Sequence, residues 1–250
     1  MEEDGNRPIL PPPLPPPVEV RLVTTGDHPC AYLPGRTARN RAFLAGRIGG
    51  GIYHAFMDAG FRRSGRMIYQ PVCPACRACV PIRVPVDLFL PSKSQRRCAR
   101  KNEDVSIAAA EPVATDEKYD LFRRYVLARH GDAMAERESF ESFLYESPVD
   151  TVEFTYRDRA GALLAVGICD VSAMSLSTVY FYFDPAASKR GLGTFGAVRE
   201  IAFAREAGIP HYYLGFWVGG CRAMEYKREF EPSEFLHPDG TWRAQPPNVM

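Results

Sequence analysis

Several features that define other protein classes are missing from this sequence of 250 residues. No uninterrupted apolar run approaches the roughly 20 residues that a membrane-spanning helix needs. The acidic and then proline-rich start lacks the basic residues and apolar core of a secretory signal. We therefore expect a soluble, cytoplasmic protein that has no membrane partner. The cysteines number seven, which is odd, so we expect thiols, metal ligands or redox groups rather than a disulfide framework.

Net charge is almost absent as well, but the average of +1 conceals a division along the chain. Residues 30–101 contain 14 Lys and Arg against only Asp58 and Asp87, which leaves about +12 there and −11 elsewhere. Cations clustered on one surface attract a polyanion that dispersed cations do not. The basic segment is therefore a candidate for nucleic-acid binding, and an ordinary solvated surface is the alternative. The residues that we expect to contact phosphates are Arg62, Arg63, Arg96, Arg97 and Lys101.

Apolar spacing and turn residues predict a mixture of helices and strands. In the first half we expect strands over residues 18–24, 67–72 and 80–86, and helices over 52–60, 92–102, 115–130 and 135–146. In the second half we expect a three-strand meander over 151–156, 163–170 and 178–183. A glycine-containing loop over 188–194 follows, then a helix to Gly208, a strand over 211–216 and a last helix through Phe230. We see no internal repeat.

The order of these elements predicts an α+β protein with two lobes. Seven of the ten residues 8–17 are proline, which favours an extended polyproline conformation, so residues 1–17 are expected to form a disordered tail. A small cysteine-bearing, basic N-terminal lobe is expected over residues 18–112. The elements of residues 113–240 are similar to the mixed-sheet acyltransferase fold of the Gcn5-related superfamily, and residues 241–250 are a second tail.

Four cysteines form the most distinctive chemical pattern of the N-terminal lobe. Cys73, Cys76 and Cys79 are separated by two residues each, and Cys30 precedes them in a loop. Such spacing lets sulfur atoms converge on one ion, as in a closed zinc site or in part of an iron–sulfur ligand set. Buried thiols that pack as small hydrophobic groups are the alternative.

Several ordered sequence blocks resemble one known family. In the first half these are residues 30–39 (CAYLPGRTAR), 60–65 (GFRRSG), 73–84 (CPACRACVPIRV) and 92–97 (SKSQRR). In the second half they are residues 180–185 (YFYFDP), 192–195 (LGTF), 213–217 (YLGFW) and 224–227 (MEYK). Together they resemble the bacterial aspartate/glutamate leucyltransferases, which are relatives of the eukaryotic arginyl-tRNA–protein transferases. The resemblance extends from about residue 22 to residue 236.

The resemblance implies a transfer of leucine from leucyl-tRNA to the N-terminal Asp or Glu of a protein, which marks that protein for degradation in the N-end rule pathway. Leucyl-tRNA and such proteins are then the partners. The aminoacyl ester is already activated, so the chemistry requires no cofactor. The enzyme has to hold the two reactants together, keep the attacking amine neutral and stabilise a tetrahedral oxyanion.

Candidate residues for these tasks follow from residue type and position. We expect Asp184 to accept the proton of the amine and Tyr180 or Tyr182 to donate towards the reacting oxygen atoms. Arg77 or Arg83 is expected to pair with the acidic side chain of the first residue of the substrate protein, with Lys227 as the second choice. The other residues that we assign to substrate binding are Tyr32, Arg36, Gly193, Thr194 and Trp217.

Three alternatives remain open at the level of sequence. Arginine as the transferred amino acid would require an acidic donor pocket, whereas leucine requires an apolar one. A coenzyme A acetyltransferase would use the loop 188–194 to bind pyrophosphate, but Ser188 stands where that superfamily usually has glutamine or arginine. A zinc-containing module that binds tRNA without turnover is the third alternative.

Overall fold

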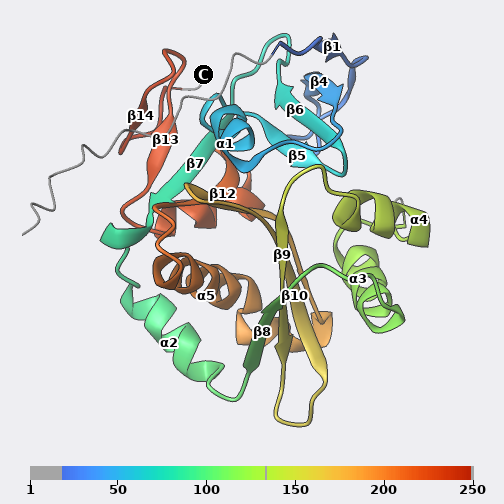
Figure 1. Cartoon of the computed structure of the whole chain (residues 1–250), viewed down its shortest axis with the longest axis vertical. Helices are drawn as coiled ribbons and strands as arrows, with labels where there is room; N and C mark the ends of the chain where they lie inside the picture. Colours follow the sequence, from blue (N-terminus) through green and yellow to red (C-terminus); the bar gives the residue numbers. More distant parts are fainter. Residues whose placement is uncertain (1–18, 133, 249–250) are drawn as a thin grey trace, which may run out of the picture.

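An eight-stranded mixed sheet runs through the molecule in the order β14-β13-β7-β12-β11-β10-β9-β8 (Figure 1). The computed structural model describes residues 19–132 and 134–248, so the tail expected over 1–17 lies outside the described residues. The strands are β7 (Cys79–Pro85), β8 (Ser106–Ala110), β9 (Thr151–Arg157), β10 (Leu163–Ser172), β11 (Ser175–Phe183), β12 (His211–Val218), β13 (Glu234–Leu236) and β14 (Trp242–Arg243).

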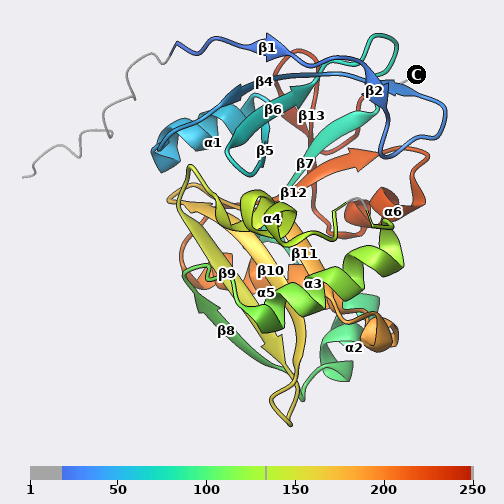
Figure 2. The ribbon, with the colours of Figure 1, turned by 90° about the vertical axis from the view of Figure 1, so that its right-hand side faces the viewer.

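The centre of this sheet opens between β11 and β12. The antiparallel pairs β9–β10 and β10–β11 confirm the predicted meander. The parallel pair β11–β12, in contrast, is bonded only where Ser175, Leu176 and Ser177 lie opposite His211, Tyr212 and Tyr213. The remaining residues of β11 and β12 are not paired with each other, and the two strands separate in Figure 2. We call the opening between the unpaired parts of β11 and β12 the sheet split.

Helices cover both faces of the large sheet (Figure 1). On one face lie α5 (Leu192–Glu206) and α2 (Lys93–Lys101), and on the other α3 (Asp116–Arg129) and the short α4 (Arg137–Phe140), which continues as a π-helical turn, η2 (Glu141–Tyr145). Ser92 and Gln95 form a capping box that starts α2, which confirms the helix predicted over residues 92–102. The helix expected to run through Phe230 is shorter than predicted: α6 (Arg222–Glu225) gives way to the 3-10 helix η4 (Tyr226–Glu229).

A smaller sheet packs against one end of the large one. Its strands lie in the order β1 (Val23–Thr24), β4 (Asn40–Leu44), β6 (Met67–Pro71) and β5 (Arg62–Ser64), and a hairpin of β2 (His28–Pro29) and β3 (Thr37–Ala38) lies beside them. Helix α1 (Gly50–Asp58) buries Tyr53 and Met57 against it. Within the described residues, no helix combines the length and apolarity that crossing a membrane requires.

The expected α+β class and mixed sheet are confirmed. The large sheet, however, contains strands from both sides of the lobe boundary that we expected near residue 112. Strand β7, which carries Cys79, pairs antiparallel with β12, and β8 pairs with β9. Residues 79–110 therefore contribute strands to the same sheet as the C-terminal half. The reason lies in burial: Val80, Ile82 and Val84 alternate along β7 and pack into the core beneath α5.

One buried ion pair joins the two sheets. Arg63 of β5 donates to both carboxylate oxygens of Asp170 on β10, at 2.7 and 2.8 Å, and both side chains are fully buried. Tyr53 Oη of α1 donates to Asp170 Oδ2 at 2.7 Å, and Thr151 Oγ1 donates to Oδ1 at 3.0 Å. The carboxylate is thus saturated by donors from three other elements, which compensates for its removal from water.

Removing the charge of Asp170 should destabilise the protein strongly. We expect Asp170→Asn to lower the free energy of unfolding by about 3–5 kcal/mol, because Arg63 would remain buried without its counter-charge. The measurement is equilibrium unfolding in urea. The matched control is Asp150→Asn, since the Arg47–Asp150 pair is more than half exposed and its loss should cost at most about 1 kcal/mol. Equal losses for the two variants would contradict this account.

Candidate active site

Two buried cations lie where β12 departs from regular pairing. The register between β12 and β7 shifts between Tyr213 and Gly215, and Gly215 has φ +85°, which favours glycine. Arg62 Nη2 donates to the carbonyl of Gly215 at 3.1 Å, and Lys227 Nζ donates to the carbonyl of Phe216 at 2.9 Å. The bulge thereby presents two successive carbonyl groups to two positively charged side chains at the edge of the sheet split.

The positive charge of this pair is not balanced by a bonded carboxylate. Arg62 is 5% exposed and Lys227 is 8% exposed, and within the described residues their hydrogen bonds go to backbone carbonyls. Burial, reinforced by the charge of Arg62, lowers the pKa of Lys227 to about 7. Burial also lowers the pKa of Arg62. With a pKa of about 7, Lys227 is only partly protonated at neutral pH, and a nearby anion would favour its charged form and relieve the cost of burying the pair.

Unused hydrogen-bond donors occur on the strands around the split. Arg62 Nε, Trp217 Nε1 and Tyr180 Oη are buried and have no partner among the described residues. They belong to β5, β12 and β11. Buried polar groups in folded proteins are almost always hydrogen-bonded, so each such group calls for an explanation. Trp217 lies in the core beneath α5 and Tyr180 packs against rings of α3 and η2, so these donors do not face one common ligand.

A cavity of about 210 Å³ lies beside β12. Phe216 contributes to its wall, and the carbonyl of the same residue accepts from Lys227. Tyr69 packs edge-on against Phe216, with ring centroids 6.4 Å apart. Tyr32, one of the residues assigned to substrate binding, also lines the cavity. The remaining wall is formed by the β2–β3 hairpin and by strands of the smaller sheet.

Three of the four predicted metal ligands line the same cavity: Cys30, Cys73 and Cys79. Cys30 Sγ accepts from the backbone amides of Tyr32 and Leu33, both at 3.4 Å. Burial, together with four neighbouring thiols, raises the pKa of Cys79 to about 12; these thiols are Cys73, Cys30, Cys76 and Cys221. Across the described ranges, no group of three or more His, Cys, Asp or Glu side chains has the arrangement of a metal site.

The residues predicted to be catalytic lie on β11 and directly after it. Asp184 caps the 3-10 helix η3 (Pro185–Arg190): its Oδ1 accepts from the amide of Ala186 at 2.9 Å and its Oδ2 from Arg124 at 3.2 Å. Tyr182 is fully buried, with its hydroxyl 3.4 Å from that of Tyr145. Tyr180 packs among aromatic rings of α3 and η2. The contacts of Asp184 are those of a helix cap and an ion pair, and Tyr180 Oη has no partner among the described residues.

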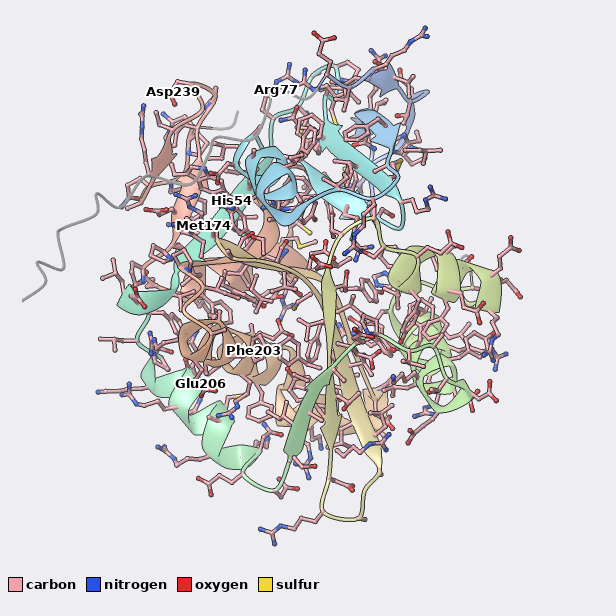
Figure 3. The ribbon with its side chains drawn as sticks, viewed as in Figure 1. His54, Arg77, Met174, Phe203, Glu206 and Asp239 are labelled. Carbon is pink, nitrogen blue, oxygen red and sulfur yellow. The ribbon has the colours of Figure 1, made fainter. Side chains whose placement is uncertain are left out.

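The two arginines expected to bind an acidic side chain are already engaged. Arg83 donates to Asp58 at 2.8 Å and to Glu234 at 2.7 Å, so two carboxylates neutralise it. Arg77 is exposed in the loop before β7 and donates to the carbonyls of Cys73 and Cys76 (Figure 3). Lys227 was the second choice for this role. Unlike Arg77 and Arg83, it makes a single hydrogen bond within the described residues, to the carbonyl of Phe216.

The predicted tRNA-binding residues fall into two groups. Arg62 and Arg63 are buried, which corrects the expectation that they contact phosphates from the surface. Arg96, Arg97 and Lys101 are exposed on α2, together with Lys93 and Arg100. Of the other substrate-binding candidates, Arg36 is exposed in the loop before β3, Gly193 and Thr194 form the first turn of α5, and Trp217 is buried in the core beneath that helix.

Sequence reasoning missed Gly215 and Phe216 as site residues. A glycine inside a strand pattern is a recognised signal for a bulge, and the run from Tyr213 to Trp217 contains one. The role of Arg62 in the interior was not recognisable, because a charged residue in the run Phe61-Arg62-Arg63 suggests a surface position unless its partners are known.

Comparison with known proteins identifies the family. The family models for the arginine-tRNA-protein transferase N terminus and C terminus match residues 28–97 and 117–237. The chain is 41% identical over 225 residues to the aspartate/glutamate leucyltransferase of Stenotrophomonas maltophilia (86% of this chain, 90% of the relative). It is 40% identical over 232 residues to that of Halorhodospira halophila (90% and 98%).

Among solved structures, the chain is similar to the C-terminal domain of a putative lysylphosphatidylglycerol synthetase from Agrobacterium fabrum, with 17% identity and a TM-score of 0.49 over 81% of this chain and 65% of that one. It is also similar to a GCN5-related N-acetyltransferase from Kribbella flavida, with 17% identity and a TM-score of 0.37 over 72% and 59%. The matches to the two family models and to the curated relatives show that this chain belongs to the arginine-tRNA-protein transferase family.

Proposed function

We propose that this protein transfers leucine from leucyl-tRNA to the N-terminal Asp or Glu of proteins, creating a degradation signal. The observation that carries the proposal is the identity of about 40% to aspartate/glutamate leucyltransferases over almost their whole length. The reaction is an aminolysis: the α-amino group of the acceptor attacks the ester carbonyl of leucyl-tRNA, an amide bond forms, and the 3′ ribose oxygen leaves and takes up a proton.

We place the reaction at the sheet split, beside the β12 bulge. An ester carbonyl beside the β12 bulge would lie next to Arg62 and Lys227. As the amine attacks, negative charge develops on that oxygen, and buried cations stabilise it more effectively than water does because they are already oriented. A proton must also leave the attacking amine, whose unperturbed pKa is about 7.7–8.0, so a weak acceptor such as a carboxylate suffices.

Helix α2 is the surface that we propose for the tRNA backbone. Its exposed face carries Arg96, Arg97 and Lys101, and the carbonyl of Lys189 in η3 accepts from Lys101. The face therefore borders the loop that leads into α5. Arginine suits this role because its planar fork donates two hydrogen bonds to one phosphate.

Zinc or an iron–sulfur cluster at Cys30, Cys73, Cys76 and Cys79 stays a prediction. As they are placed, these thiols do not form a metal-binding group within the described residues. Elemental analysis of the purified protein, with Cys98→Ser as a control outside this set, tests the prediction. Metal that copurifies in stoichiometric amounts and is lost in Cys76→Ser but not in Cys98→Ser would support it.

The experiment that tests the proposed function is a transfer assay. Purified protein is mixed with separately charged leucyl- and arginyl-tRNA and with peptides beginning with Asp, Glu, Lys or Ala. We expect leucine on the Asp and Glu peptides only, and no transfer of an acetyl group from labelled acetyl coenzyme A without tRNA. Transfer of arginine instead, or binding of tRNA without turnover, would refute the proposal.

Lys227→Met should slow single-turnover transfer by about 10²- to 10³-fold, because the oxyanion would lose one of its two cations. Binding of uncharged tRNA and the urea unfolding midpoint should change little, since an apolar side chain of similar length replaces a buried one. The matched control is Lys189→Met, which removes an exposed lysine of η3. A Lys227→Met enzyme as fast as the Lys189→Met enzyme would exclude the oxyanion role.

Asp184→Asn tests the proposed proton acceptor. The asparagine keeps an oxygen that can accept from the amide of Ala186, so η3 should stay intact, while the charge and the basicity are lost. We expect transfer to fall by about 10²- to 10⁴-fold, the usual contribution of a general base. Arg124→Ala is the control, because it removes only the ion pair. Unchanged transfer in Asp184→Asn would show that the residue is solely a cap.

A further inference from the structure

Among the described residues, the wall of the 210 Å³ cavity beside Phe216 contains no carboxylate. Its side chains are aromatic, aliphatic, thiol or small polar groups, together with the imidazole of His28. Tyr32, Tyr69 and Phe216 supply the aromatic surface, and Met67, Pro71 and Ala38 supply aliphatic surface. Thiols add little polarity, because a free cysteine behaves as a small hydrophobic group.

The volume fits a small aliphatic side chain. A cavity of about 150 Å³ lined by apolar residues binds benzene, which has six carbon atoms. The present cavity is larger, and the side chain of leucine has four carbon atoms. Leucine therefore fits, and its burial is favourable by about 0.8 kcal/mol per CH₂ group removed from water.

The position of the cavity relative to the two cations is set by Phe216. The ring of this residue forms part of the wall, its carbonyl accepts from Lys227, and the guanidinium of Arg62 lies 5.6 Å from its ring centroid. An amino acid whose side chain enters the cavity would thus hold its ester carbonyl, two bonds from the side chain, close to Arg62 and Lys227.

We propose that this cavity is the pocket for the leucyl side chain of the donor and that its lack of a carboxylate excludes arginine. This inference rests on the proposed function and adds the residues that select the amino acid. A guanidinium buried in the cavity would have no acidic partner there, and burying an unpaired charge is far more costly than burying an aliphatic group. Ala38 on β3 and Asn40 at the start of β4 are the wall positions best suited to a test, because each side chain can be changed without removing an aromatic ring.

The first test enlarges Ala38. Ala38→Leu fills part of the cavity, and Thr37→Leu adds the same side chain one residue earlier on β3, where successive side chains point to opposite faces and Thr37 does not line the cavity. One tRNA is acylated with leucine, valine or alanine, and single-turnover transfer to an Asp peptide is measured. We expect Ala38→Leu to reduce the preference for leucine over alanine by about 10- to 200-fold, and Thr37→Leu to leave it unchanged.

The second test adds a charge without a change in size. Asn40→Asp places a carboxylate in the wall, so transfer of leucine should fall and transfer of arginine from the same tRNA should rise above the wild-type level. The unfolding midpoint of each variant is measured in urea to confirm that it is folded.

The outcomes separate the two proposals. A wild-type enzyme that does not transfer leucine to the Asp peptide refutes the proposed function. A wild-type enzyme that transfers leucine, together with an unchanged preference among the three amino acids in folded Ala38→Leu and an unchanged ratio of leucine to arginine in Asn40→Asp, refutes the pocket alone.

Discussion

The buried pair of Arg63 and Asp170 is the interaction on which the arrangement of the site depends. It fixes β5 of the smaller sheet to β10 of the large sheet, and α1 takes part through Tyr53. Arg62 is the preceding residue of β5, so the same attachment determines where its guanidinium lies. With β5 held in place, Arg62 reaches the carbonyl of Gly215, and the open cavity lies between the smaller sheet and β12.

The two adjacent arginines illustrate how surroundings decide the role of a charge. Arg63 is paired with the carboxylate of Asp170, which compensates for its burial, so its charge stabilises the contact between the two sheets. Arg62 has only carbonyl groups and the rings of Tyr213 and Phe216, which leaves its charge available to a ligand. Lys227 adds a second cation whose pKa of about 7 reflects the same environment. A site that concentrates uncompensated positive charge next to an apolar cavity suits an amino-acid ester whose carbonyl becomes negative during the reaction.

Much of the fold was predictable from local sequence signals. The meander and the helices α2 and α3 were expected because apolar spacing and turn residues are local patterns. The pairing of β7 with β12 was not, because it joins segments about 130 residues apart and no local pattern records such a contact. Short strands such as β5 were missed for a similar reason: their charged residues pair with distant partners.

The site was predictable to a lesser degree. Tyr32 and Lys227 were selected and lie at the cavity and at the bulge, whereas Arg83 was selected for a charge that Asp58 and Glu234 already neutralise. Residue type alone cannot reveal whether an arginine has a partner. Phe216 was overlooked because an aromatic residue in a strand usually indicates core packing, and only its place beside the bulge gives it a second role.

The central claim is that the ester carbonyl of leucyl-tRNA lies beside the β12 bulge. The most direct measurement is a crystal structure with adenosine carrying leucine through a non-hydrolysable amide at its 3′ position. The account predicts the leucyl side chain in the cavity against Phe216, with the carbonyl oxygen of the amide within hydrogen-bond distance of Lys227 or Arg62. An analogue bound elsewhere, with the cavity and both cations untouched, would contradict it.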